Sequence, residues 1–268
     1  MNETLESIAQ ALFKSWFVDF DPAQGERTRA GANDDVLSVH PELVEGFPSE
    51  FEFNEEMGWI PKGWVVSDVG SEFNTVGGAT PSTKNQDFWE DGDINWTTPK
   101  DLSGSQSKVL LETNRRITDL GLQKISSGLL PVDTVLMSSR APVGYLALAK
   151  VPVAINQGYI AIKGEKTLTS EYALLWAESI MDEIKQRAGG TTFAEISKKS
   201  FRNIPLFIPD SESVEEYSKL VKDIYNQITH RLQNIESLTK LRDTLLPKLL
   251  SGELRIPDAE KLINEAQK

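Results

Sequence analysis

Residues 238–250, LTKLRDTLLPKLL, decide the fold because they repeat the pattern of residues 5–17, LESIAQALFKSWF. At a constant offset of 233 residues, six apolar positions of the first segment correspond to six leucines of the second. They are Leu5, Ile8, Leu12, Phe13, Trp16 and Phe17, matched by Leu238, Leu241, Leu245, Leu246, Leu249 and Leu250. A duplicated helix around one globular region, Trp59 to Pro209, indicates one unit of a two-unit, pseudo-symmetric spacer protein. Two unrelated amphipathic helices would also share this spacing, and periodicity alone leaves that alternative open.

The composition excludes several kinds of chemistry. The 268 residues contain no cysteine and only two histidines, His40 and His230. Disulfides, thiolate nucleophiles and thiolate zinc sites are therefore excluded, and we expect no metal site. No apolar run approaches the ~20 residues of a membrane span, and residues 1–3 do not resemble the start of a signal peptide. We therefore expect a cytoplasmic protein with no membrane partner.

The negative charge of the chain is unevenly distributed. The formal net charge is −12, of which −10 falls within residues 1–60. Residues 61–210 and 211–268 each carry a net charge of −1. Because the central region is nearly neutral, it can still present a basic face, and binding to DNA stays open.

Composition and periodicity predict an α+β fold. Short apolar runs bounded by Pro and Gly predict strands at residues 132–137, 145–149, 151–155 and 159–162. Helical spacing predicts helices over residues 2–18 and 169–187. Residues 204–209 are predicted to be an extended exit, that is, a non-helical segment by which the chain leaves the domain, because prolines there exclude a helix. We predict one mixed, β-rich domain combined with long amphipathic helices. The predicted segments are a helix (1–21), an acidic linker (22–58), the domain (59–210), a long helix (211–255) and a tail (256–268).

Apolar residues follow a heptad spacing from residue 211 onward. The two series contain Val214, Tyr217, Val221, Ile224, Ile228, Ile235, Leu238 and Leu245. So narrow a seam predicts pairing with another helix, as in an antiparallel coiled coil. The N-terminal helix is too short to cover all of it, so the sequence predicts a partner chain.

The sequence contains no convincing catalytic motif. Residues 77–84 lack the spacing of a phosphate-binding P-loop, and residues 95–99 only superficially resemble the Asn-Pro-Pro-aromatic motif of amino-methyltransferases. Both histidines lie outside the central domain, so no Ser/His/Asp set is available. We therefore expect a non-catalytic binding component without a cofactor. A self-contained methyltransferase or nuclease is the less favoured alternative.

Positively charged and amide side chains gather on segments that we predict to be loops, where they can contact phosphates and base edges. The candidates for DNA binding are Lys84, Lys100, Arg115, Arg116, Lys124, Arg140, Gln157, Lys198, Lys199 and Arg202. Arg140 has the strongest claim because it ends a strand-like run, although a buried ion pair with a carboxylate such as Asp133 is an equally good interpretation. We interpret Phe88, Trp89 and Trp96 as core or loop-anchoring aromatics.

Motifs along nearly the whole chain resemble one family, the specificity subunit of type I restriction-modification systems. They are residues 2–22, GWIPKGW (58–64), GGATPS (77–82), DINWTTPKDL (93–102), SSRAPVGYLA (138–147), NQG (156–158), TFAEISK (192–198) with FRNIP (201–205), and LRDTLLPKLLSGEL (241–254). The order of these motifs is that of the family, which makes the set more specific than any single motif.

The resemblance implies a frame of two target-recognition domains separated by two conserved helices in an antiparallel coiled coil. Each domain reads one half of a split site in double-stranded DNA, and the helices fix the spacing. Two modification subunits dock on the frame and methylate adenine at N6, while a separate restriction subunit, a motor-nuclease, cleaves the DNA. S-adenosylmethionine, ATP and Mg would belong to those partner subunits.

The chain resembles the C-terminal half of such a subunit. Residues 1–21 correspond to the end of the central conserved helix, residues 59–210 to the second target-recognition domain and residues 211–255 to the distal conserved helix. Two interpretations stay open: a fragment, or a half-sized subunit that forms a homodimer or joins a second half-subunit. Because the motifs are shared by members that read different sequences, we expect base readers in the segments between them. A protein-interaction adaptor that never touches DNA is a rival interpretation, favoured by the acidic flank.

Overall fold

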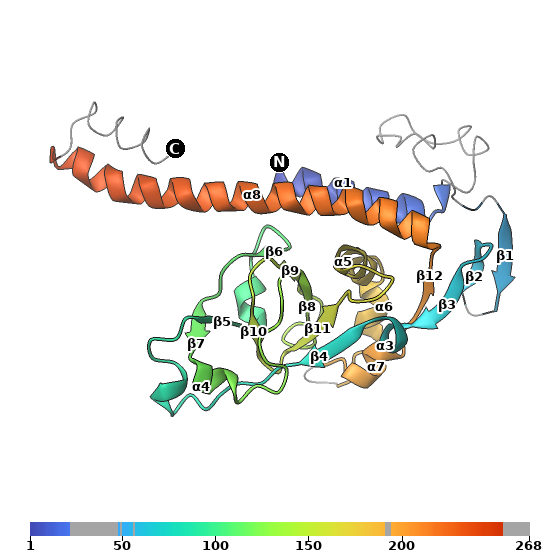
Figure 1. Ribbon diagram of the computed structural model, residues 1–268, viewed down its shortest axis with the longest axis horizontal. Helices are drawn as coiled ribbons and strands as arrows, with labels where there is room; N and C mark the ends of the chain where they lie inside the picture. Colours follow the sequence, from blue (N-terminus) through green and yellow to red (C-terminus); the bar gives the residue numbers. More distant parts are fainter. Residues whose placement is uncertain (22–47, 49, 56, 191–193, 254–268) are drawn as a thin grey trace. The chain divides into compact units, whose positions relative to one another are not determined.

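The computed structural model describes residues 1–21, 48, 50–55, 57–190 and 194–253 (Figure 1). Most of the predicted linker, with His40 and Phe47, and the whole predicted tail lie outside the described residues. The chain divides into two units, residues 1–225 and 226–268. Helix α8 (Ser211–Leu250) begins in the first unit and continues into the second.

A five-stranded sheet with the order β4-β11-β8-β9-β6 forms the centre of the first unit. Its strands are β4 (Asn74–Gly77), β6 (Val109–Leu110), β8 (Thr134–Ser138), β9 (Leu146–Ala149) and β11 (Tyr159–Lys163). All neighbours are antiparallel except β6 and β9. The apolar runs that we predicted to be strands supply β8, β9 and β11, and every residue of β8 is buried. These strands confirm the prediction of a mixed, β-rich domain.

Smaller sheets extend the first unit. A three-stranded sheet has the order β10-β5-β7, and two-stranded sheets pair β1 with β2 and β12 with β3. The strands are β1 (Phe51–Asn54), β2 (Gly58–Pro61), β3 (Val65–Asp68), β5 (Ile94–Thr97), β7 (Arg115–Ile117), β10 (Ala154–Ile155) and β12 (Pro205–Ile208). Strand β12 is the predicted extended exit. The three-stranded sheet has its own core, which includes Trp96, Ile117, Ile125 and Ala154.

Short helices connect and cover these sheets. They are α3 (Val69–Glu72), η3 (Gln86–Phe88), η4 (Pro99–Leu102), α4 (Asp119–Leu122), α5 (Ser170–Ser179), α6 (Met181–Gln186) and α7 (Lys198–Arg202). The sequence predicted one helix over residues 169–187, and this was wrong in detail. Ile180, with φ −105° and ψ 19°, leaves helical geometry and separates α5 from α6. The Thr169 side chain begins α5 by accepting a hydrogen bond from the Tyr172 amide.

Helix α1 (Asn2–Phe17) lies antiparallel to the first part of α8 (Figure 1). The Phe17 ring lies 4.8 Å from that of Tyr217 in α8 and 5.1 Å from that of Tyr172 in α5. Phe13 and Trp16 also contact Tyr217, at 6.0 and 5.8 Å between ring centroids. Such edge-to-face aromatic packing adds to the burial of apolar area. The rings of α1 therefore join three helices in one aromatic cluster.

The predicted helix-pairing residues have different surroundings in the two units. Val214, Tyr217 and Val221 of the first unit are buried, Ile224 is half-buried, and Tyr217 contacts α1. In the second unit, Ile228 and Leu245 are buried, whereas Ile235 and Leu238 are 57% and 59% exposed. Whether these residues pair with a further helix stays a prediction.

The two copies of the repeated helix also differ. Four of the six repeated apolar side chains of α1 are buried, namely Leu12, Phe13, Trp16 and Phe17. Among their counterparts at the end of α8, Leu246 is 48% and Leu250 79% exposed. Helix α8 ends at Leu250, shortly before Gly252 with a φ of +76°, a left-handed conformation that favours glycine after a helix.

Phe17→Ala is expected to lower the free energy of unfolding by about 3–5 kcal/mol, because it removes a fully buried ring from the aromatic cluster. Phe53→Ala is the control, since that ring is 64% exposed and packs against the exposed Trp59. The control is expected to lose about 1 kcal/mol or less. Urea unfolding of both variants measures the difference, and equal losses would contradict the importance of the cluster.

Candidate nucleic-acid interface

Motifs that are far apart in the sequence meet at one end of the five-stranded sheet. Strand β11 is antiparallel to both neighbours, with Ile160 opposite Gly77 and Tyr159 opposite Ser138. The ends of β4 and β8 therefore lie beside the start of β11. We call this region the motif end and define it as residues 77–80, 97–100, 138–144, 156–158 and 195–198.

Backbone hydrogen bonds tie the loops of the motif end together. The Ser139 amide donates to the Gly158 carbonyl at 2.8 Å, and the Ile196 amide donates to the Ser139 carbonyl at 3.0 Å. The Ala79 amide donates to the Ile155 carbonyl at 3.0 Å. Gly78 lies so close to that carbonyl that a Cβ at this position would be 1.9 Å from the oxygen. The close approach explains the glycine and shows that this loop has little freedom to shift.

The DINWTTPKDL motif joins the same region through Tyr159. The Tyr159 hydroxyl donates to the Thr98 carbonyl at 2.7 Å, and the Asn156 amide donates to the Thr97 carbonyl at 3.0 Å. Burial raises the pKa of Tyr159 far above its ordinary value, so the phenol remains a neutral donor. The Thr98–Asp101 capping box begins η4 and orients the turn that carries Lys100.

Four candidate DNA-binding residues lie at the motif end: Lys100, Arg140, Gln157 and Lys198. The Gln157 carbonyl oxygen accepts a hydrogen bond from the Thr80 hydroxyl at 2.7 Å. Lys198 lies over Gly77, since a Cβ on that glycine would be 3.5 Å from the Lys198 Nζ. The side chains of Lys100, Gln157 and Lys198 are exposed, and that of Arg140 is partly exposed. These groups can therefore reach a ligand in front of this end of the sheet.

Arg140 forms an ion pair, but not with the carboxylate that we named. Its Nη1 lies 3.5 Å from Glu195 Oε2, and the two side chains are 37% and 48% exposed. Asp133 instead pairs with Lys150 at 2.6 Å. The alternative of a buried pair between Arg140 and Asp133 is wrong, because Asp133 is already held by Lys150. A half-exposed pair of this kind contributes little to stability and leaves the guanidinium accessible.

A second group of candidate cations lies around the three-stranded sheet. The Arg115 guanidinium lies 3.6 Å from the centre of a Trp89 ring, and the Lys124 Nζ lies 5.6 Å from that of Phe88. Trp89 is itself anchored, since its indole N–H donates to the Ser82 carbonyl at 3.1 Å. Cation–π contacts orient both cations without neutralising them. As predicted, these aromatic residues anchor loops, and Trp96 is buried.

The prediction that the candidate cations lie on loops is wrong for several of them, because Arg115 and Arg116 belong to strand β7 and Lys198, Lys199 and Arg202 to helix α7. Arg202 donates to the Thr75 hydroxyl at 2.6 Å and to the Thr75 carbonyl at 2.5 Å, so its guanidinium is partly engaged within the chain. Lys84, Arg116 and Lys199 are exposed. Within the described part of the chain, Arg140 alone among the nine candidate cations forms an ion pair. The others keep a positive charge that no described carboxylate neutralises directly.

Sequence reasoning missed one polar cluster, formed by Glu6, Lys108 and Glu178. Glu6 is charged and is not one of the repeated apolar positions of its helix, yet it is buried in the structure. The three side chains come from segments about 70 to 100 residues apart, so no local pattern could have connected them.

The family model described as "Type I restriction modification DNA specificity domain" matches residues 61–239. The chain belongs to this family. It is 33% identical over 198 residues to the type I restriction enzyme MjaIX specificity subunit of Methanocaldococcus jannaschii, covering 73% of this chain and 46% of that protein. It is 29% identical to the HindI specificity subunit of Haemophilus influenzae, covering 95% and 62%.

A solved structure shares the fold. The HsdS subunit from Thermoanaerobacter tengcongensis matches with a TM-score of 0.50 and 19% identity, over 94% of this chain and 52% of that one. The chain thus spans roughly half the length of these relatives. The family description names DNA specificity, in agreement with the expectation of a non-catalytic subunit. No helix among the described residues is long and apolar enough to cross a membrane.

Arg140→Ala is expected to weaken the retention of target DNA by the assembled complex by about 1–3 kcal/mol, because a positive charge at the motif end is lost. Arg187→Ala is the matched control, since Arg187 follows α6, is 36% exposed and pairs with Glu183 of that helix. Gel shifts at one fixed salt concentration measure both variants. Equal effects of the two, or unfolding of the Arg140 variant, would favour a structural role.

Proposed function

We propose that the chain is the DNA-recognition unit of a type I restriction-modification complex and that its domain reads one half of a split site in double-stranded DNA. The observation that carries this proposal is the motif end. There, family motifs from five parts of the chain are bonded together and surrounded by Lys100, Arg140, Gln157 and Lys198. Cations on fixed loops contact phosphates and set the register of a protein on the duplex.

Base reading belongs, in this proposal, to the segments between the motifs. Residues 84–91 and 102–124 follow motif residues along the chain and are more exposed than the motif end. Residues 163–170 instead follow the far end of β11 and include the buried Leu168 and Ser170, so the structure does not favour this third segment as a base reader. Arg116 lies in the edge strand β7, next to the oriented Arg115. An exposed arginine of this kind can donate two hydrogen bonds to a guanine edge.

The helices supply the spacing and the docking surface for two modification subunits. Antiparallel packing of α1 on the first part of α8 supports this role within the first unit. The exposed Ile235 and Leu238 support pairing of α8 with a helix of a second copy or another half-subunit. A two-fold pair of identical units would read a palindromic split site.

Catalysis belongs to the partners in this proposal. The modification subunits carry S-adenosylmethionine and methylate adenine at N6, and the restriction subunit uses ATP and Mg to cut DNA. The chain itself then needs no cofactor, and its place is the cytoplasm, with the DNA. Within the described residues, no three His, Cys, Asp or Glu side chains are grouped as metal ligands.

A gel shift tests the proposal, with the chain alone and with its modification subunits. The duplex contains the sequence at which adenine is methylated in the DNA of the host. Retention of that duplex over a scrambled one by the assembled complex is the expected result, at one stated salt concentration. Assembly without sequence preference would favour the adaptor interpretation, for which the exposed seam of α8 is the supporting observation. Methyl transfer by the purified chain alone would contradict a non-catalytic role.

Ile235→Asp is expected to abolish pairing through α8 while leaving the domain folded, because the side chain is 57% exposed in the chain itself. Ile228→Asp is expected to disturb assembly and also the helix, since Ile228 is fully buried. Ser237→Asp is the control, an exposed position outside the seam. Light scattering of the chain and of its mixture with modification subunits measures assembly. An unchanged mass for Ile235→Asp would reject the pairing role.

A further inference from the structure

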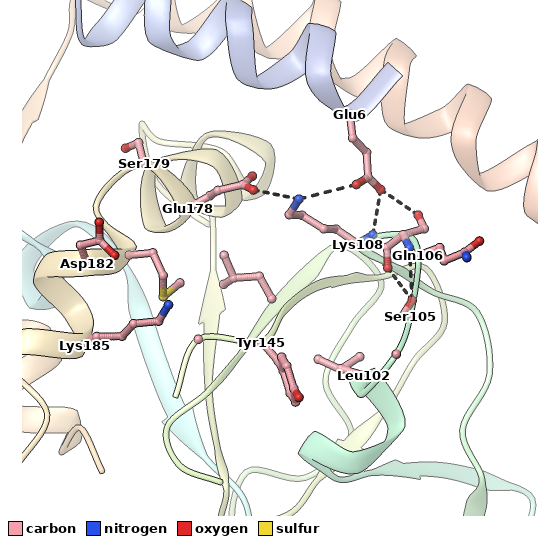
Figure 2. Close-up of a pocket in the computed structure, with 15 residues that line it drawn as sticks. Glu6, Leu102, Ser105, Gln106, Lys108, Tyr145, Glu178, Ser179, Asp182 and Lys185 are labelled. Atoms are coloured by element: carbon pink, nitrogen blue, oxygen red, sulfur yellow. Dashed lines mark hydrogen bonds and ion pairs between the residues drawn. The ribbon is translucent and has the colours of Figure 1, made fainter. Parts of the chain in front are cut away.

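A buried carboxylate of α1 holds a loop of the recognition domain (Figure 2). Glu6 is 7% exposed, and its Oε1 accepts hydrogen bonds from the Lys108 amide and the Ser107 hydroxyl, both at 2.8 Å. Its Oε2 lies 3.6 Å from the Lys108 Nζ. Glu6 thus binds both the backbone and the side chain of this loop.

Lys108 extends the cluster to helix α5. Its Nζ lies 2.8 Å from Glu178 Oε1, which also accepts a hydrogen bond from Gln10 Nε2 at 2.9 Å. Figure 2 shows the Lys108 side chain lying between the two glutamates. We call Glu6, Gln10, Ser107, Lys108 and Glu178 the Glu6 clamp. It links α1, the loop before β6 and the end of α5.

The clamp gives α1 a second point of attachment to the domain. The first is the aromatic cluster at Phe13, Trp16 and Phe17, which lies seven to eleven residues further along the helix. At 1.5 Å per residue, the two attachments are roughly 10–16 Å apart. Ala9 and Leu12, which lie between the two, are also buried, so the clamp adds a directed polar contact near the start of a helix face that is otherwise held by apolar packing.

The clamp contacts the central sheet at its edge strand. Lys108 precedes β6, the edge strand, and its carbonyl accepts a hydrogen bond from the Leu148 amide of β9 at 2.7 Å. The preceding residues Ser103 to Gln106 are exposed and connect back to η4 and the motif end. A displacement of α1 at Glu6 would therefore be transmitted to the sheet that carries the motif end.

The chemistry of the clamp favours a role in geometry over a role in stability. Buried ion pairs are costly to desolvate and are often no more stabilising than apolar side chains of the same volume. Glu178 Oε2 is also buried without a hydrogen-bond partner among the described residues, an unfavourable arrangement. A hydrogen bond to a backbone amide nevertheless fixes the position of α1 relative to the Lys108 loop. Apolar contacts are less directional and allow the helix to slide.

We propose that Glu6 is a positioning residue whose clamp fixes the angle between α1 and the recognition domain, and thereby the gap between the two half-sites of the split DNA target. This inference rests on the proposed function, because a gap exists only if each domain reads one half-site. It adds that the gap depends on a side-chain contact as well as on helix length.

Glu6→Ala tests the inference because it removes both the charge and the oxygen that accepts from the Lys108 amide, with Glu3→Ala as a control at an exposed position of the same helix. Each variant is produced with its modification subunits in a host lacking adenine-N6 methylation, and methylated sites are mapped across the host DNA. Glu6→Ala is expected to methylate the same half-sites, with the share of sites whose gap differs by one base pair raised about fivefold or more. The control keeps the gap of the unchanged protein.

Lys108→Met is the second variant, since it removes the cation that joins Glu6 to Glu178 and is expected to relax the gap in the same way. Relaxation in either folded variant, with the control unchanged, supports the inference. A lower melting temperature with an unchanged gap in both variants would overturn it, as would altered half-sites at the original gap. If the unchanged protein methylates no split sequence at all, the proposed function itself fails, which is a separate and recognisable result.

Discussion

The packing of the α1 rings against Tyr172 and Tyr217 is the constraint on which the rest of the structure depends. Tyr172 belongs to α5 and Tyr217 to α8. The contact therefore joins helix α5, which packs on the central sheet, to the start of the long helix α8. The Tyr217 hydroxyl is buried without a hydrogen-bond partner among the described residues. Burial also raises the pKa of Tyr217 well above its ordinary value, so the ring behaves as an apolar group in this cluster.

The recognition domain has a rigid end and more exposed segments between its motifs. At the motif end, backbone hydrogen bonds and the close approach of Gly78 to Ile155 leave the loops little freedom. Around the three-stranded sheet, Arg115 is instead oriented by an aromatic face. In the function proposed above, the bonded loops would be the fixed frame and the more exposed segments would read the bases. The Glu6 clamp would orient that frame relative to α1.

Much of the fold could be predicted because its signals are local. Short apolar runs bounded by Pro and Gly identified β8, β9 and β11, and helical periodicity identified α1 and α8. The break at Ile180 could not be predicted, since the apolar spacing continues across it. The ion pairs of Arg140 with Glu195 and of Asp133 with Lys150 depend on which strands are neighbours, and sequence spacing does not contain that information. Glu6 was missed for the same reason, because its partners come from distant segments.

The most direct test of the central claim is an exchange of domains. Residues 62–209 would be replaced by the corresponding segment of the HindI relative, and the sequences methylated by the complex would be mapped before and after the exchange. If this domain reads a half-site, the half-site should change to one read by the donor while the gap set by the helices is kept. An unchanged methylated sequence in a complex that still assembles would contradict the account.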